Sequence, residues 1–333
     1  MARIALLTGG STPERDVALA GASQVAPALR GLGHQVTVVD TVEGWLDAAR
    51  EAALLDPAVD REPPSAAELA ALAARESLPA LVASEAVRGF DLLFLVLHGG
   101  AVEGGQLQAL LELARLRFTG SGSLASGLAM HKLVANRLLR DAGIPTAGWV
   151  RLPATAAELD ELGWPRIVKP SNAGSSVGIS VAHDPDELAP AIAAARAVDA
   201  EVLVERFLPG REFTVGVVGG RALGVGEIVP RHEIFDYECK YTPGMTRETF
   251  PAEIPPALAG RLRELALATH RTLELRDFSR VDFRLDADEE PRVLEANTLP
   301  GMTRTSLLPQ SAAVEGIDFA ALCDEICRLA LAR

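Results

Sequence analysis

The chain has 333 residues, and its 48% of hydrophobic and 23% of charged residues indicate a globular protein with a sizeable core rather than a disordered chain. A formal net charge of −13 argues against a nucleic-acid-binding surface, although a locally basic cleft can still hold a nucleotide. No stretch approaches the roughly 20 apolar residues of a membrane span. Because the apolar run within residues 1–8 is also too short for a signal peptide, we expect a cytoplasmic protein of two or three domains, with no nucleic-acid or membrane partner.

The first third of the chain alternates strands and helices. Residues 4–8 predict a buried strand, followed by a glycine turn and a helix to about residue 30. Further strands are predicted at 34–40 and 90–97, the latter a continuous apolar run of the kind found in parallel sheets. This alternation indicates a βαβ domain. The alanine-rich segment 56–88 reads as peripheral helix and loop, with no chemistry that we can name.

The middle third begins with a helical stretch from Gly122 to a stop at Gly143-Ile-Pro145. The elements predicted after it are a strand at 166–169, a strand at 178–181, a helix at 185–198 and a strand at 202–205.

The last third is richer in strands. Its predicted elements are strands at 212–218 and 222–228, an irregular polar segment from 230 to 250, a helix at 256–273, a hairpin and a terminal helix. Of the three cysteines, Cys239, Cys323 and Cys327, no two have the CxxC spacing of metal ligands. We expect Cys323 and Cys327 to share one helix face as small core residues.

The hairpin carries the clearest chemical signal. A strand repeats every two residues, so Arg280 and Asp282 share one face, as do Glu295 and Asn297. The turn formers of segment 286–291 would fold the two runs together. The resulting face presents two carboxylates, a carboxamide and a guanidinium. Mg²⁺ prefers a few carboxylates together with substrate phosphates, so this hairpin indicates a protein that handles ATP.

A second signal is Lys169 at the end of a strand, followed by the small-residue loop 171–178. Small residues let backbone N–H groups approach an anion closely, and the hydroxyls add donors. The loop is not a Walker motif, because no GK[ST] precedes a helix. An ordinary turn is the alternative, and the lysine together with the downstream carboxylates favours phosphate binding.

Glu205 to Glu212 joins two strands and could offer backbone groups to a purine edge, with Glu212 near a ribose. A solvated charged connection is the alternative.

His98 ends a buried strand before two glycines, at an edge where open α/β sheets bind ligands, and we favour a ligand contact over a structural role. The long polar segment around 236–241 is interpreted as a lid rather than an ordinary exposed loop.

Two interpretations of Ser11-Thr-Pro-Glu14 stay open. Ser11 could cap the following helix, with Pro13 in its first turn and Glu14 completing a capping box. Alternatively, Glu14 holds a substrate ammonium group. Both can be true.

With these residues in view, the chain resembles the D-alanine–D-alanine ligases of the ATP-grasp superfamily, essentially from end to end. The segments that carry the resemblance are GGSTPERDVAL (9–19), HGGAVEGG (98–105), TGSGSLASGLAMHK (119–132), IVKPSNAGSSVGIS (167–180), FDYECKY (235–241), RVDF (280–283) and EANTLPGMTRTS (295–306). The last two and the lysine loop are highly specific in combination.

The resemblance implies an α/β (α+β) ATP-grasp fold of three domains. These are an N-terminal βαβ domain at 1–120, a central domain at 121–208 and a C-terminal domain at 209–333, the last with a lid at 230–250. ATP lies between the latter two. The residues implied to bind ATP are Lys132, Lys169, Gly174, Ser176, Val177, Glu205, Phe207, Leu208 and Glu212. Two Mg²⁺, replaceable by Mn²⁺, are implied at Asp282, Glu295 and Asn297.

For the substrates, the resemblance implies that Glu14 holds the ammonium group of the first D-alanine and His98 its carboxylate. Ser306 is implied to bind the carboxylate of the second D-alanine. Ser175 and Tyr241 would link with Glu14 in a hydrogen-bonded triad that braces the closed lid.

The implied reaction is dipeptide formation for peptidoglycan. ATP turns a carboxylate, a poor acylating agent, into an acyl phosphate that the second amine attacks. Lys240 would meet the transferred phosphate, while Arg280 and the Gly301 N–H stabilise the tetrahedral intermediate. Such catalysis rests on positioning and electrostatics, and needs no covalent nucleophile on the protein.

Three positions depart from the family pattern: Gly104 and His131 stand where acids are usual, and Ala18 where a small hydroxyl is common. They lie near the first-substrate pocket and put the choice of amino acid, more than ATP use, in question. Tyr241 is retained, which favours dipeptide over depsipeptide synthesis. The alternatives are a divergent ligase that joins other amino acids or carboxylates, and a nucleotide-binding protein without catalysis. The resemblance also suggests a homodimer.

Overall fold

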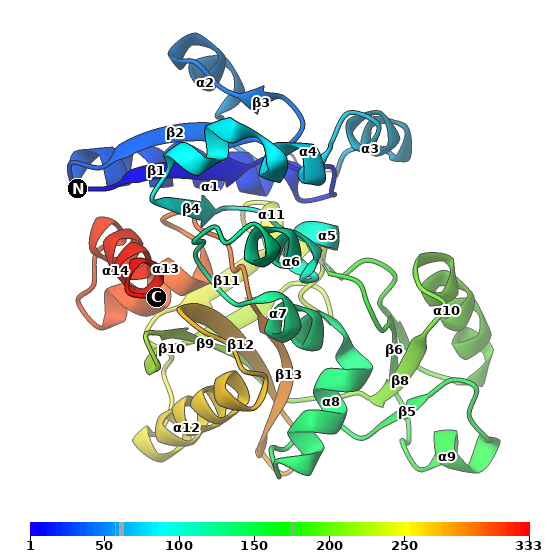
Figure 1. Ribbon diagram of the computed structural model, residues 1–333. Helices are drawn as coiled ribbons and strands as arrows, with labels where there is room; N and C mark the ends of the chain where they lie inside the picture. Colours follow the sequence, from blue (N-terminus) through cyan, green and yellow to red (C-terminus); the bar gives the residue numbers. More distant parts are fainter. Residues whose placement is uncertain (57, 60–62, 175) are drawn as a thin grey trace.

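The computed structural model describes residues 1–56, 58–59, 63–174 and 176–333, and its strands form three sheets that meet around one centre (Figure 1). The N-terminal sheet has the order β3-β2-β1-β4. In it, β1 (Arg3–Thr8) lies parallel to both β2 (Gln35–Asp40) and β4 (Leu92–Leu95). The helix α1 (Arg15–Gly31) connects β1 to β2, which confirms the predicted βαβ unit.

The C-terminal helix completes the core of this first domain. The buried face of α14 (Phe319–Leu331) includes Cys323, Ile326 and Cys327, and it joins the same hydrophobic cluster as Ile4 and Leu29. Figure 1 shows this red helix beside the blue and cyan elements of the N-terminal sheet. The prediction that the two cysteines are core residues is confirmed, and the two ends of the chain share one core.

The middle sheet has the order β5-β8-β6-β7 and is antiparallel throughout. Its elements are β5 (Trp149–Arg151), α9 (Ala156–Asp160), β6 (Arg166–Pro170), β7 (Ser180–Ala182), α10 (Pro185–Val198) and β8 (Val202–Arg206). The stretch predicted as one helix after Gly122 is two, α7 (Ser123–Met130) and α8 (Lys132–Asp141), because His131 between them has an extended ψ of 91°.

The C-terminal sheet has the order β11-β10-β9-β12-β13. Its elements are β9 (Glu212–Val218), β10 (Arg221–Pro230), β11 (Thr246–Thr249), α12 (Pro256–Thr272), β12 (Phe278–Leu285) and β13 (Pro291–Asn297). The predicted hairpin is confirmed: Arg280 lies opposite Asn297, and Asp282 opposite Glu295. A β-bulge follows Asp282, so the face that holds the polar side chains ends at that point.

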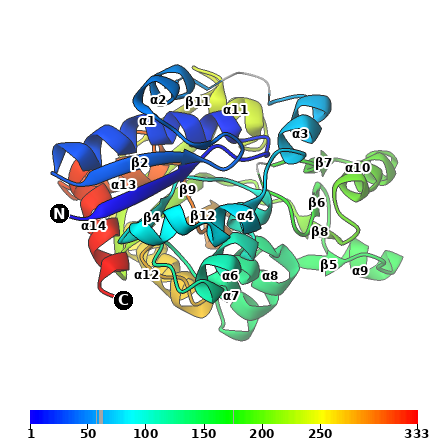
Figure 2. The ribbon, with the colours of Figure 1, turned by 45° about the horizontal axis from the view of Figure 1, so that its top comes forward.

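Several elements were not predicted. The segment 230–250 is not irregular throughout, because it contains α11 (Tyr237–Tyr241), capped by Asp236, and β11. The other unpredicted elements are β3 (Gly44–Trp45), α2 (Ala48–Leu54), α5 (Gly100–Glu103), α6 (Gln106–Leu113) and α13 (Leu307–Val314). The helices α3 (Ala66–Ala73) and α4 (Leu78–Ala83), followed by a 3-10 turn (Glu85–Gly89), agree with the helix and loop expected for segment 56–88. In Figure 2, α3 and α11 lie toward the end of the N-terminal sheet at which β1 finishes, where Tyr241 of α11 bonds Glu14. Among the described residues, no helix combines the length and apolar character needed to cross a membrane.

Candidate active site

Two adjoining cavities lie where the three sheets meet. The larger has a volume of about 480 Å³ and is lined by residues from all three sheet regions. The smaller, of about 100 Å³, lies between the middle and C-terminal sheets. Lys132, Phe235, Lys240 and Glu295 line both cavities. These four residues therefore mark the junction at which groups held in the two cavities would meet.

Most of the residues predicted from the sequence line one of these cavities. Besides the junction residues, the larger cavity is lined by Glu14, His98, Gly174, Tyr241, Arg280, Asn297, Gly301 and Ser306. The smaller is lined by Lys169, Ser176, Glu205, Phe207, Leu208, Glu212 and Asp282. Val177 is exposed and lines neither of them, while Ser175 lies outside the described residues.

At the junction, Glu295 is surrounded by cations. The Nζ of Lys132 lies 3.5 Å from the Glu295 carboxylate, and Lys169, Lys240 and Arg280 also act on it. Burial favours a higher pKa for Glu295, but these positive charges outweigh it and lower the pKa to about 2. Glu295 is therefore ionised at neutral pH, and the lysines around it can also face a bound anion.

Asp282 shares its oxygens among three neighbours. Arg280 donates two hydrogen bonds to it, at 2.9 and 2.8 Å, and Thr214 donates one at 2.7 Å. The Nδ2 of Asn297 donates a further bond at 2.9 Å, so the carboxamide nitrogen of Asn297 faces Asp282. For Arg280, burial favours a lower pKa, but the charge of Asp282 outweighs it and raises the pKa further. Arg280 thus remains a permanent cation beside Asp282, and it also lines the larger cavity.

The smaller cavity holds a buried ion pair. The Nζ of Lys169 lies 2.6 Å from Glu205, and the amide of Asn136 donates to the same carboxylate at 3.1 Å. The side chain of Glu205 is thereby committed to protein partners, which leaves backbone groups of the following segment to meet a ligand. Deeper in the slot, burial raises the pKa of Glu212 to about 7.

At the far end of the larger cavity, the hydroxyl of Tyr241 donates to Glu14 at 2.7 Å. Two of the three predicted triad members are thus joined. The predicted capping box is wrong: Ser11 donates instead to Glu76 at 2.6 Å, and Glu14 precedes α1 without a side-chain cap hydrogen bond. Glu76 comes from the segment 56–88, whose contact with this loop no local pattern could show.

His98 sits at the end of β4, as predicted, and is buried. Its Nδ1 contacts the carbonyl oxygen of Leu299 at 3.0 Å, and its buried Nε2 has no hydrogen-bond partner among the described residues. Burial lowers the pKa of His98, so the ring is neutral at neutral pH. Because a carbonyl only accepts, the Nδ1 carries the proton and the Nε2 presents a lone pair.

The second-substrate side is held by a tight turn. The Ser306 hydroxyl accepts from the backbone N–H of Thr303 at 3.1 Å. A Cβ at position 301 would lie 2.8 Å from this Ser306 oxygen, so Gly301 is required for the turn to close. Across the cavity, the Nζ of Lys240 lies 3.4 Å from Ser176, which itself donates to the carbonyl oxygen of Phe235 at 3.1 Å. The small-residue loop and α11 are therefore linked.

The sequence did not point to Glu103, which also lines the larger cavity. Glu103 is half-buried, its carboxylate accepts from the Gly99 N–H at 2.9 Å, and desolvation by the surrounding protein raises its pKa to about 7. Its place within the motif at 98–105 was the available signal.

Two of the positions that depart from the family pattern, Gly104 and His131, have structural surroundings of their own. A Cβ at Gly104 would lie 2.9 Å from the Gly100 carbonyl oxygen. His131 bridges Ser171, at 2.9 Å, and Glu201, at 3.1 Å, rather than entering the cavity.

The smaller cavity lies between two sheets and holds a buried lysine–glutamate pair, and the hairpin beside it carries carboxylates. This arrangement defines an ATP-grasp protein of mixed α and β structure. Models of two ligase domains match this chain: that described as D-ala D-ala ligase N-terminus over residues 3–121, and that described as D-ala D-ala ligase C-terminus over 138–328. The chain belongs to the D-alanine–D-alanine ligase family, and it is an ATP-dependent ligase.

Relatives support this over the full length. The D-alanine–D-alanine ligase of Synechococcus sp. (strain JA-3-3Ab) is 39% identical, with 99% of this chain and 94% of the relative covered. That of Nitratidesulfovibrio vulgaris (strain DP4) is 40% identical, with 99% and 98% covered. The crystal structure of the Bacillus anthracis D-alanine–D-alanine ligase complexed with ATP matches with a TM-score of 0.79 and 28% identity, covering 100% and 98% of the two chains. The VanG D-Ala:D-Ser ligase from Enterococcus faecalis matches with the same TM-score of 0.79 and 29% identity, covering 98% of each chain.

Proposed function

We propose that this chain joins two D-alanines into D-alanyl-D-alanine for peptidoglycan, through an acyl phosphate made from ATP. The observation that carries the proposal is the junction, where Lys132, Lys240 and Glu295 line both cavities. A nucleotide in the smaller cavity would direct its terminal phosphate to this point. A carboxylate in the larger cavity would reach the same point from the other side, as phosphoryl transfer requires.

In the first step, a carboxylate oxygen of the first D-alanine attacks the γ-phosphorus of ATP, and ADP leaves. Glu14 would hold the ammonium group of this D-alanine, and the hydroxyl of Tyr241, 2.7 Å away, fixes the position of the Glu14 carboxylate. Lys132, Lys169 and Lys240 would offset the charge of the phosphates. These cations are already in place in the folded protein, so little reorganisation accompanies the transfer.

In the second step, the amine of the second D-alanine, after losing a proton, attacks the acyl carbon, and phosphate leaves. Ser306 would hold the carboxylate of this D-alanine. Arg280 would stabilise the oxyanion of the tetrahedral intermediate together with the Gly301 N–H. The bidentate contact with Asp282 fixes the guanidinium plane of Arg280, so its remaining N–H groups have a defined direction toward the cavity.

The hairpin fits Mg²⁺. Asp282 and Glu295 are directly opposite each other across two strands, and the low pKa of Glu295 keeps it ionised. The carboxamide nitrogen of Asn297 is turned toward Asp282, and its oxygen makes no hydrogen bond among the described residues. Asp282, Glu295 and Asn297 would hold the two Mg²⁺, or Mn²⁺ in their place, which would supply charge compensation for the phosphates of ATP.

A second candidate is a ligase that accepts another residue in the second position. The likeness to a D-Ala:D-Ser ligase favours it. Phosphate release from ATP, measured with a panel of D-amino acids and hydroxy acids, separates the two. Release with D-alanine alone supports the first function, release with a different second substrate supports the other, and no release with any of them contradicts both.

We also propose that the protein acts in the cytoplasm as a homodimer. The resemblance to the family supports both points. A single species at twice the 35.1 kDa mass of the chain in analytical ultracentrifugation is the expected result, and a species at 35.1 kDa would contradict the dimer.

A further inference from the structure

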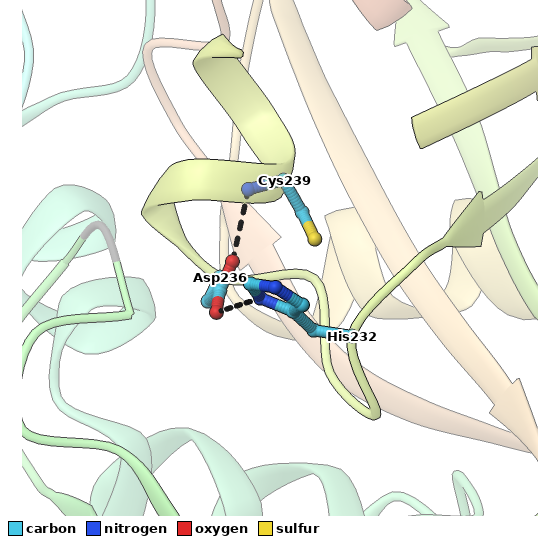
Figure 3. A group of neighbouring side chains, drawn as sticks. All are labelled: His232, Asp236 and Cys239. Carbon is cyan, nitrogen blue, oxygen red and sulfur yellow. Dashed lines mark hydrogen bonds and ion pairs between the residues drawn. The ribbon is translucent and has the colours of Figure 1, made fainter. Parts of the chain in front are cut away.

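A group of three potential metal ligands lies outside the cavities just described. His232 follows β10, Asp236 immediately precedes α11, and Cys239 is in the middle of α11. One ligand atom from each of the three lies within 4.8 Å of the others. Figure 3 shows the Asp236 carboxylate against the His232 imidazole, with the Cys239 thiol directed from α11 toward the loop that carries His232.

The local fold holds this group in place without a metal. Asp236 accepts from the backbone N–H of Cys239 at 2.9 Å, which caps α11, and it contacts the Nδ1 of His232 at 2.7 Å. The hydroxyl of Thr246 donates to the Cys239 carbonyl oxygen at 2.6 Å, which ties α11 to β11. The Asp236 carboxylate therefore positions the His232 ring directly, and it positions Cys239 by capping the helix that carries it.

The exposure of the three residues suits a bound ion. Cys239 is buried, whereas the side chains of His232 and Asp236 remain 39% and 32% exposed. A cation could reach the group from solvent on the side of His232 and Asp236, with the thiol behind it. Water can complete the coordination on the open side.

We propose that His232, Asp236 and Cys239 form a binding site for a borderline-soft divalent cation of the Zn²⁺ class. A nitrogen, an oxygen and a sulfur ligand suit Zn²⁺, whereas Mg²⁺ selects oxygen ligands alone. In a tetrahedral zinc site, two ligand atoms lie about 3.3–3.8 Å apart, given bond lengths of about 2.0–2.3 Å. The three ligand atoms lie within 4.8 Å of one another, so a bound ion would draw closer any pair that now exceeds this spacing. The Cys239 thiol would lose its proton to solvent on binding.

The site has a consequence for α11, because the next two residues, Lys240 and Tyr241, line the larger cavity. A cation shared by residues 232, 236 and 239 would tie the helix to the loop before it. Opening of the segment would then require breaking metal bonds as well as hydrogen bonds. We expect amide hydrogen exchange across residues 232–241 to slow when the cation binds.

The test uses Co²⁺ as a spectroscopic substitute for Zn²⁺, added to the whole protein in the presence of excess Mg²⁺. A thiolate-to-cobalt charge-transfer band reports only a cysteine-bound ion, so cobalt at the oxygen ligands of the hairpin does not contribute. We expect one equivalent to give this band together with the intense visible absorption of tetrahedral cobalt, and Zn²⁺ to abolish both. The slowed hydrogen exchange is measured on the same samples with Zn²⁺.

The variants make the assignment specific. His232→Ala, at an exposed residue, and Cys239→Ala are expected to lose the band. Asp236→Asn, which retains an N-cap side chain, should weaken binding at least tenfold. Cys323→Ala, at a buried cysteine of α14, is the matched control and should keep the band. The proposal is overturned if the unmodified protein shows no thiolate band, if the band survives in His232→Ala, or if Cys323→Ala removes it.

Discussion

The two cavities of the site hold their charges in different ways. In the smaller cavity, Lys169 and Glu205 form a direct pair at 2.6 Å, and in this state they need no ligand to balance them. In the larger cavity, His98 is buried and Glu103 half-buried, and the pKa values of both are shifted toward their neutral forms. The comparison teaches that the Lys169–Glu205 pair is electrostatically prepared in advance, while the charges of His98 and Glu103 depend on what binds. Glu212, deeper in the smaller cavity, resembles Glu103, because burial raises its pKa to about 7 as well.

The difference follows from how each wall is built. Lys169 and Glu205 lie on adjacent strands of one sheet, β6 and β8, so their pairing is fixed by strand register. His98 and Glu103 lie around the end of β4, and a distant segment that includes Leu299 packs against His98 and lines the same cavity. Burial there comes from domain packing, which removes water without supplying a counter-charge for each group.

The junction between the two cavities should give the largest effect. Replacing Glu295 with Gln keeps the shape but removes a charge from the proposed metal site and from the centre of three lysines. We expect kcat to fall at least 1,000-fold, a loss of about 4 kcal/mol in transition-state stabilisation. Circular dichroism and thermal unfolding should show an intact fold. Asn297→Ala should behave similarly, and near-normal turnover in either variant would contradict the metal assignment.

Breaking the prepared pair in the smaller cavity should come next. Lys169→Met leaves Glu205 buried beside Asn136 without its cation, which should cost about 3 kcal/mol of unfolding free energy and raise the KM for ATP roughly 100-fold. The double variant Lys169→Met, Glu205→Gln should recover most of the stability but not the KM. Chemical denaturation and steady-state kinetics measure the two effects separately. Equal stability of the single and double variants would show that the pair is not buried in solution.

On the amino-acid side, His98 should make substrate binding depend on pH. The neutral ring presents a lone pair at Nε2, so it can hold a carboxylate only after taking up a proton. Since burial lowers the pKa of His98, binding becomes less favourable as the pH rises above that pKa. We expect the KM of the first D-alanine to increase up to about tenfold per pH unit between pH 6 and 8.5. His98→Gln, whose amide donates at any pH, should flatten this profile. A flat profile in the unmodified protein would mean that Nε2 does not bind the carboxylate.

The smallest effect concerns stability alone. The pKa of Glu103 is raised to about 7 in the folded protein, so folding favours its protonated form, and this advantage is lost as the pH rises from about 4.5 to 7. Glu103→Gln keeps an acceptor for the Gly99 N–H and removes the buried charge. We expect it to gain on the order of 1–3 kcal/mol at pH 8, and to match the unmodified protein at pH 4. Thermal unfolding at both pH values checks this, and a gain of equal size at both would point to packing instead of charge.

How far the sequence alone could go differs between the parts of the site. The hairpin was predictable because a strand fixes which side chains share a face, and the structure confirms it and adds that Asp282 lies directly opposite Glu295. The lysine loop and His98 were likewise indicated by their places at strand ends. The ligand roles of all these residues stay predictions. The capping box at Ser11 failed for a physical reason: α1 begins at Arg15 with Glu14 at its N-cap, so Ser11 lies before the helix, where its hydroxyl donates to Glu76 from a distant segment.

The amino-acid sequence by itself determined most strands and helices through periodicity, and it indicated the hairpin, the lysine loop and His98 through local motifs. The ATP-grasp fold and further residues around the cavities, such as Lys132 and Ser306, were implied by the resemblance to the ligase family. Only the tertiary structure decided the charge states of His98 and Glu103, the bond between Ser11 and Glu76, and the convergence of His232, Asp236 and Cys239. Burial and close approach depend on which surfaces pack together, and no local pattern of residues contains that information.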